Sequence, residues 1–133
     1  MNCLHRSDFN TVTLNNYHFM GWAEGNAITL PDTINLLETQ RDAAGHLTHC
    51  PTPKQGGQVI LRFEPQSLSV YHLHSVLAKQ RQLGYTLWQG EITFDHGRIA
   101  LVHGMLTQAP LAPVSSTALQ YVFEFETIFY EKR

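Results

Sequence analysis

Hydrophobic and polar residues alternate along several short stretches of the chain, the pattern of strands that bury one face. The clearest example follows a glycine pair and spans Gln58–Glu64. Val59, Leu61 and Phe63 share one face of this stretch. Pro65 comes next and cannot donate a ladder hydrogen bond. The pattern therefore predicts a half-buried strand that ends at this proline.

Directly after this strand the hydrophobic spacing changes to three and four residues, which is typical of a helix. The residues on this stripe are Val70, Leu73, Val76 and Leu77. Ser67 or Ser69 can cap the free amides at the start, and Gly84 suits the left-handed position after the last turn. We expect one helix over residues 67–83.

Other alternating stretches predict hairpins. Residues 10–14 and 17–20 flank Asn15-Asn16, a pair that tolerates the positive φ of tight hairpin turns. Residues 85–94 and 99–106 flank a short turn that contains a glycine. The last predicted strand places Leu119, Tyr121, Phe123, Phe125 and Phe129 on a core face. Its other face is largely polar, so the chain as a whole is expected to be mainly antiparallel β with one helix.

Residues 41–55 show little periodicity, and a loop of this length is uncommon in a compact domain. Such loops often contact a partner, although a plain connection is the alternative. With 133 residues and 43% hydrophobic content, the chain is predicted to form a single domain over residues 1–133.

The charge balance weakens the case for nucleic-acid binding. The chain has nine lysines and arginines and a net charge of −2, whereas gripping phosphates requires clustered cations. No apolar run is long enough to span a membrane and no signal peptide is evident, so a soluble, non-secreted protein is expected. Cys3 and Cys50 are too few to form a disulfide framework and are expected to be free thiols.

Candidate chemistry is sparse. His72 and His74 are two apart on the predicted helix, which is the wrong spacing for a zinc pair. His46, His49 and Cys50 come closer to a ligand set, but a fourth ligand has no evident source. No nucleophile elbow or phosphate-binding loop is present either. We expect a protein that is not an enzyme and that needs no metal or cofactor.

The stretch from Gly56 to Val70 and the following helix resemble the tail tube proteins of contractile-tailed bacteriophages, which place a glycine before an alternating strand, then a break and one leucine-rich helix. Glu24–Leu30 resembles their early glycine-bounded strand. Gly45–His49 resembles the tip of their long loop, and Val122–Glu126 their closing strand. The resemblance covers most of the chain.

This resemblance implies an antiparallel β-sandwich or split barrel with a flanking helix outside the inner sheet, assembled as hexameric rings that stack into a tube. The long loop would reach the adjacent ring. The loop residues concerned are Arg41, Asp42, His46, Leu47, His49 and Lys54. Implied partners are further copies of the chain and the sheath, baseplate and tail-terminator proteins of the virion, which is assembled in the host cytoplasm.

A channel for DNA should not bind DNA, so acidic or neutral side chains are expected to face the lumen. The candidates are Gln89, Glu91 and Thr93, with Arg98 as a less secure fourth. Glu124 and Glu126 alternate onto one strand face and are read as solvated or subunit-interface charges.

Three alternatives stay open. The chain could be a tube initiator or baseplate subunit of the same fold, or the tube protein of a secretion system. It could also be a monomeric β domain that binds a ligand or metal through His46, His49 and Cys50.

Overall fold

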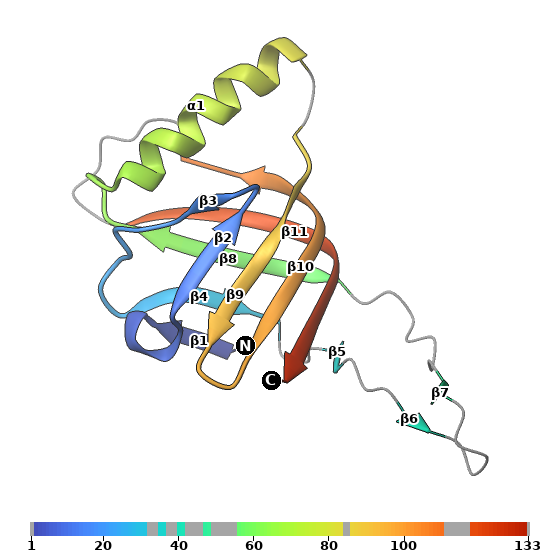
Figure 1. The fold of residues 1–133 in the computed structure, drawn as a ribbon. Helices are drawn as coiled ribbons and strands as arrows, with labels where there is room; N and C mark the ends of the chain where they lie inside the picture. The colour runs from blue at the N-terminus through green and yellow to red at the C-terminus, as the bar shows by residue number, and fades with distance from the viewer. Residues whose placement is uncertain are drawn as a thin grey trace.

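In the part of the chain that the structure describes, the main strands form a strongly curled antiparallel sheet, and one α-helix lies across one end of the curl (Figure 1). The computed structural model describes residues 2–31, 35–36, 40–41, 47–48, 56–83, 86–110 and 118–132. The main strands are β1 (Asn2–His5), β2 (Thr11–Leu14), β3 (Tyr17–His18), β4 (Asn26–Leu30), β8 (Gly57–Phe63), β9 (Trp88–Phe94), β10 (Gly97–Gln108) and β11 (Leu119–Lys132). Their order across the sheet is β1-β4-β8-β11-β10-β9-β2-β3.

The smaller elements attach to this sheet or lie beside it. A 3₁₀ turn, η1 (Arg6–Asp8), leads from β1 to β2, and β5 (Asn35–Leu36) pairs in parallel with β11. β6 (Gln40–Arg41) and β7 (Leu47–Thr48) form a separate two-stranded ribbon. The helix α1 spans Leu68–Leu83. The prediction of a mainly antiparallel β protein with one helix is thus confirmed, but the main strands form one half-barrel sheet and not the two stacked sheets of a sandwich.

Both predicted hairpins are present. β2 and β3 are joined by Asn15 and Asn16 with φ values of 50° and 66°, the positive values that a type I′ turn requires. β9 and β10 are joined by a turn over residues 95–96 and pair in register from Gly97 with Phe94. The asparagine pair therefore forms the first turn as predicted, whereas Gly97 is the first residue of β10 and directly follows the second turn.

The concave face of the sheet carries the core. Val59, Leu61 and Phe63 of β8 are buried as predicted. Leu119, Tyr121, Phe123 and Phe125 of β11 are buried as well. The prediction for Phe129 is wrong, because Ile128 takes the core position and Phe129 is only half-buried.

The reason is a change of alternation where β10 and β11 bend. His103 has a φ of 54°, and the register of β10 with β9 shifts by one residue between Leu101 and Gly104. Leu101 is buried before this bend and Gly104 is buried after it. A bulge of this kind lets a strand keep its apolar residues on the inside while the sheet turns. The register of β10 with β11 does not shift here, so β11 changes its alternation together with β10, and Phe125 and Ile128 are both buried although they are three residues apart.

The start of α1 is tied to the segment that follows β3. The Ser67 hydroxyl donates to the Met20 carbonyl, and the Met20 amide donates to the Ser69 hydroxyl at 2.8 Å. Ser67 Oγ also accepts from the Ser69 amide at 3.1 Å, so Ser67 is the predicted cap. Gly21 has a φ of 74° and packs directly on Ser67.

The helix packs mainly through its first two turns. Val70 and Leu73 are fully buried, whereas Val76 and Leu77 are half-buried. His72 and His74 lie on either side of Leu73.

The predicted C-cap of the helix at residue 84 lies outside the described residues. Within the described part of the chain, no helix is long and apolar enough to cross a membrane.

Each of the two helix histidines has a structural partner. The His72 ring stacks on Tyr17, with ring centroids 3.7 Å apart and planes 3° apart. His74 Nε2 lies 2.8 Å from the Tyr121 hydroxyl. Burial, and then the charge of Lys79, lower the pKa of His72 from its usual 6.5. Burial raises the pKa of Tyr121 to about 12.

The first prediction concerns Gly21. A Cβ there would lie 2.6 Å from the Ser67 Cβ, in addition to the cost of a positive φ, which is about 1–2 kcal/mol for a residue with a Cβ. Gly25 has a φ of 78° but nothing within 4 Å of its position, so Gly25→Ala measures the backbone cost alone. Chemical denaturation should give a loss of about 1–2 kcal/mol for Gly25→Ala and about 3 kcal/mol or more for Gly21→Ala. Equal losses would contradict the tight contact with Ser67.

The second prediction concerns His72. Because its folded pKa lies below 6.5, the unfolded chain binds more protons as the pH falls through 6.5, so the stabilisation present above that pH is lost on acidification. In His72→Phe, which keeps an aromatic ring against Tyr17, the free energy of unfolding should fall less steeply between pH 7 and pH 5 than in the wild type. The comparison at pH 8 measures the packing change alone. If the free energy of unfolding had the same pH dependence in the two proteins, a lowered pKa of His72 in the folded state would be contradicted.

Candidate functional site

The predicted lumen residues share the outer face of β9. Trp88 and Ile92 point into the core and are buried. Because side chains alternate along a strand, Gln89, Glu91 and Thr93 lie on the opposite face. Gln89 is exposed and the other two are half-buried. The structure therefore brings all three together on one surface.

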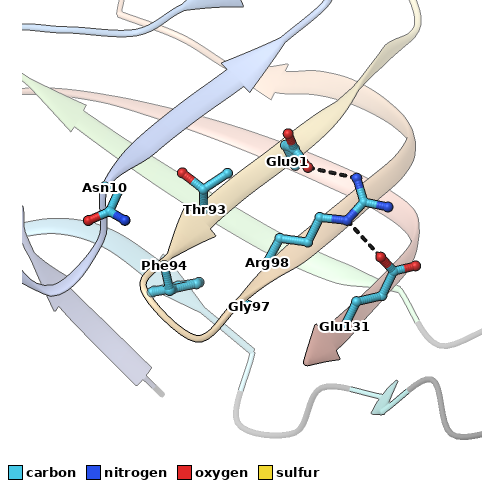
Figure 2. Close-up of a pocket in the computed structure, with 7 residues that line it drawn as sticks. All are labelled: Asn10, Glu91, Thr93, Phe94, Gly97, Arg98 and Glu131. Carbon is cyan, nitrogen blue, oxygen red and sulfur yellow. Dashed lines mark hydrogen bonds and ion pairs between the residues drawn. The ribbon is translucent and has the colours of Figure 1, made fainter. Parts of the chain in front are cut away.

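Arg98 lies at the centre of this surface. It comes just after the β9–β10 turn, and the register sets it opposite Thr93 on one side and Glu131 on the other. Its Nη1 donates to Glu91 Oε2 and its Nε to Glu131 Oε2, each at 2.7 Å (Figure 2). These two carboxylates raise the pKa of Arg98. One guanidinium between two carboxylates leaves the trio with a net negative charge.

Glu131 was missed by the sequence analysis. The signal was available in principle, since pairing β10 with β11 in antiparallel register sets residue 98 opposite residue 131. That register depends on where the two strands bend and could not be read from their alternation alone.

The outer face is hollowed on both sides of the trio. One hollow of about 440 Å³ is lined by Asn10, Glu91, Thr93, Phe94, Gly97, Arg98 and Glu131. A second of about 390 Å³ shares Glu91 and Arg98 with it and extends over β2 and Asn16. The hydroxyls of Thr11 and Thr93 are hydrogen-bonded at the rim. This is a wide, polar surface of amides, hydroxyls and paired charges.

The predicted interface pair lies on the outer side of the same sheet, beyond the bulge of β10. Glu124 and Glu126 are both exposed, on either side of buried Phe125. They line a hollow of about 690 Å³, here called the acidic hollow. Its lining residues are Leu87, His103, Met105, Thr107, Glu124, Phe125 and Glu126. Leu87 and Met105 expose 50% and 43% of their surface, so acid and apolar groups meet there.

Most of the predicted loop residues cannot be placed. Asp42, His46, His49 and Lys54 lie outside the described residues, as does Cys50. The backbones of Arg41 and Leu47 pair with each other in the β6–β7 ribbon. Residues 41–55 therefore include short strand pairing where a loop without strands was expected.

The described residues contain one cysteine and no cluster of metal-ligating side chains. Cys3 is a free, exposed thiol. Within the ranges that the structure describes, no three His, Cys, Asp or Glu side chains gather closely enough to hold a metal ion. The His72 ring stacks on Tyr17, and His74 Nε2 lies within hydrogen-bond distance of the Tyr121 hydroxyl.

Comparison with family models and with curated proteins gives no relative from which a function could be transferred. No family model matches the chain, and no curated protein matches it significantly. A functional proposal therefore depends on the geometry of the two surfaces, on the edges of the sheet and on the resemblance carried by residues 56–83.

Proposed function

We propose that this chain is a structural protein that assembles with copies of itself, as the repeating subunit of a phage tail tube made of stacked hexameric rings. The observation that carries the proposal is the open sheet. Its described strands end at β1 on one side and at β3 on the other, and β1 pairs only with β4. Unpaired edges are a liability in a monomer, and closure of a ring of subunits is one way to cover them.

The outer face of β9 and β10 supports the same proposal. Arg98 is the cation at the centre of this face, and it forms ion pairs with Glu91 and Glu131. A surface that faces passing DNA should offer phosphates no free cation, since released counterions drive such binding. Because the charge of Arg98 is paired, and because Arg98, Glu91 and Glu131 together carry a net negative charge, this face suits the wall of a channel.

Within this proposal the partners are other copies of the chain, together with the sheath, baseplate and tail-terminator proteins. The described geometry does not favour a tube subunit over a tube initiator, a baseplate subunit or a secretion-system tube. A monomeric module that binds a metal through His46, His49 and Cys50 is the alternative from a different class, and it differs in its solution behaviour.

The third prediction is therefore self-assembly. Light scattering on purified protein over a concentration series should show masses that are multiples of the 15.1 kDa chain, and negative-stain microscopy should show rings or tubes. Long tubes identify a repeating subunit and discrete rings an initiator. A monomer at every concentration, with a melting temperature that rises on adding zinc, would contradict the tube and support the metal-binding module.

The fourth prediction concerns the channel wall. Glu91→Gln with Glu131→Gln should release Arg98 and increase retention of double-stranded DNA by the assembled protein at low salt. The slope of log affinity against log salt should steepen by about one for each arginine that reaches a phosphate. Adding Arg98→Gln to the double variant is the matched control and should remove the gain. DNA retention that is unchanged by releasing Arg98 would contradict a lumen position for this face.

A further inference from the structure

The exposed large hydrophobic residues in the described part of the chain divide into two groups. Met20, Leu68 and Tyr71 lie at the start of α1, with 46%, 62% and 59% of their surfaces exposed. Leu87 and Met105 lie in the acidic hollow, far from these three in sequence. Two separate apolar surfaces on one chain are what a head-to-tail contact between copies requires.

The first surface is convex and ends in a cation. With about 100° between successive residues of a helix, Leu68, Tyr71, Ser75 and Lys79 fall within an arc of about 80°. All four are exposed, and they lie opposite buried Val70 and Leu73. This row is here called the helix ridge.

The second surface is concave and carries an acid. Met105 and Glu124 are directly opposite in the β10–β11 register, so their side chains share a face. Trp88 pairs with Gly104 in the antiparallel β9–β10 register. Leu87, which directly precedes Trp88, therefore lies beside Met105, which directly follows Gly104. The acidic hollow thus presents a row from Leu87 through Met105 to Glu124.

The two rows match in length. Tyr71 and Lys79 are eight residues apart, which is about 12 Å along a helix. From Leu87 to Glu124 the row crosses two strand spacings, which is about 10 Å. A helix that crosses the strands can therefore set Tyr71 on Leu87 and Met105 while Lys79 reaches Glu124.

The charges at the ends of the rows are unpaired within the described residues. The ion pairs found there are those of Arg98, and neither Lys79 nor Glu124 takes part in them. An exposed cation on one row and an exposed carboxylate on the other give the contact its direction.

From this complementarity we infer that the helix ridge of one copy docks in the acidic hollow of the next, with Lys79 paired to Glu124 of the neighbouring copy. The inference rests on the proposed function, since it names the contact through which copies assemble. It deepens that function by assigning the two faces of the subunit interface. Because the two faces differ, the contact is head-to-tail and closes into a ring when the rotation between copies allows it.

The test is a charge swap. Lys79→Glu and Glu124→Lys should each raise the concentration needed for assembly by about tenfold or more, because each places like charges together. Combining them should restore assembly to within about threefold of the wild type. Glu24→Lys is the control for net charge, since Glu24 is exposed and lies in neither row. Circular dichroism on each variant checks that the subunit still folds.

A second measurement does not depend on charge. Tyr71→Cys with Met105→Cys, in a chain that also carries Cys3→Ser and Cys50→Ser, should give covalent dimers and higher multimers on oxidation. Either cysteine alone should give no ladder. If the wild type assembles, single reversals that have no effect, or a swap that fails to restore assembly, together with the absence of a crosslinked ladder, would overturn this inference while leaving the proposed function standing. A wild-type chain that never assembles would overturn both.

Discussion

The contact between the start of α1 and the segment after β3 holds the rest of the structure together. Ser67 and Ser69 bind both the carbonyl and the amide of Met20, and Gly21 lies against Ser67 in a conformation that favours glycine. The Glu64 amide donates to the Gly21 carbonyl at 2.8 Å, which binds the end of β8 to the same segment. Since β8 lies near the middle of the sheet and β3 at its edge, this contact draws the two sides of the curl together. It also sets the direction in which the helix leaves the sheet.

That direction has consequences for both candidate surfaces. Because α1 is anchored by its first turns, Val70 and Leu73 face the core and the helix ridge faces outward. The bend of β10 and β11 at His103 keeps the core apolar and at the same time turns Met105 and Glu124 to the outside. The features that close the hydrophobic core are therefore the features that create the two proposed docking faces.

Local features of the fold were predictable from the sequence, and long-range ones were not. Asn15-Asn16, the alternation of β8 and the Ser67 cap are each decided by residues within a few positions of one another. The ion pairs of Arg98 with Glu91 and Glu131 depend on the register of three strands, and of the two glutamates only Glu91 was predicted for that face. The error at Phe129 has the same origin, since alternation predicts the core side only until a bulge changes it. The predicted loop contacts at Asp42, His46, His49 and Lys54 remain predictions.

We propose that this subunit forms the wall of a tube, with the outer face of β9 and β10 toward the channel. Cryo-electron microscopy of the assembled protein tests it most directly, because one map gives the symmetry and the orientation of every face. We expect six-fold rings in which Glu91, Arg98 and Glu131 line the lumen. An assembly in which this trio lies on the outside, or whose lumen is lined by unpaired lysine and arginine side chains, would contradict it.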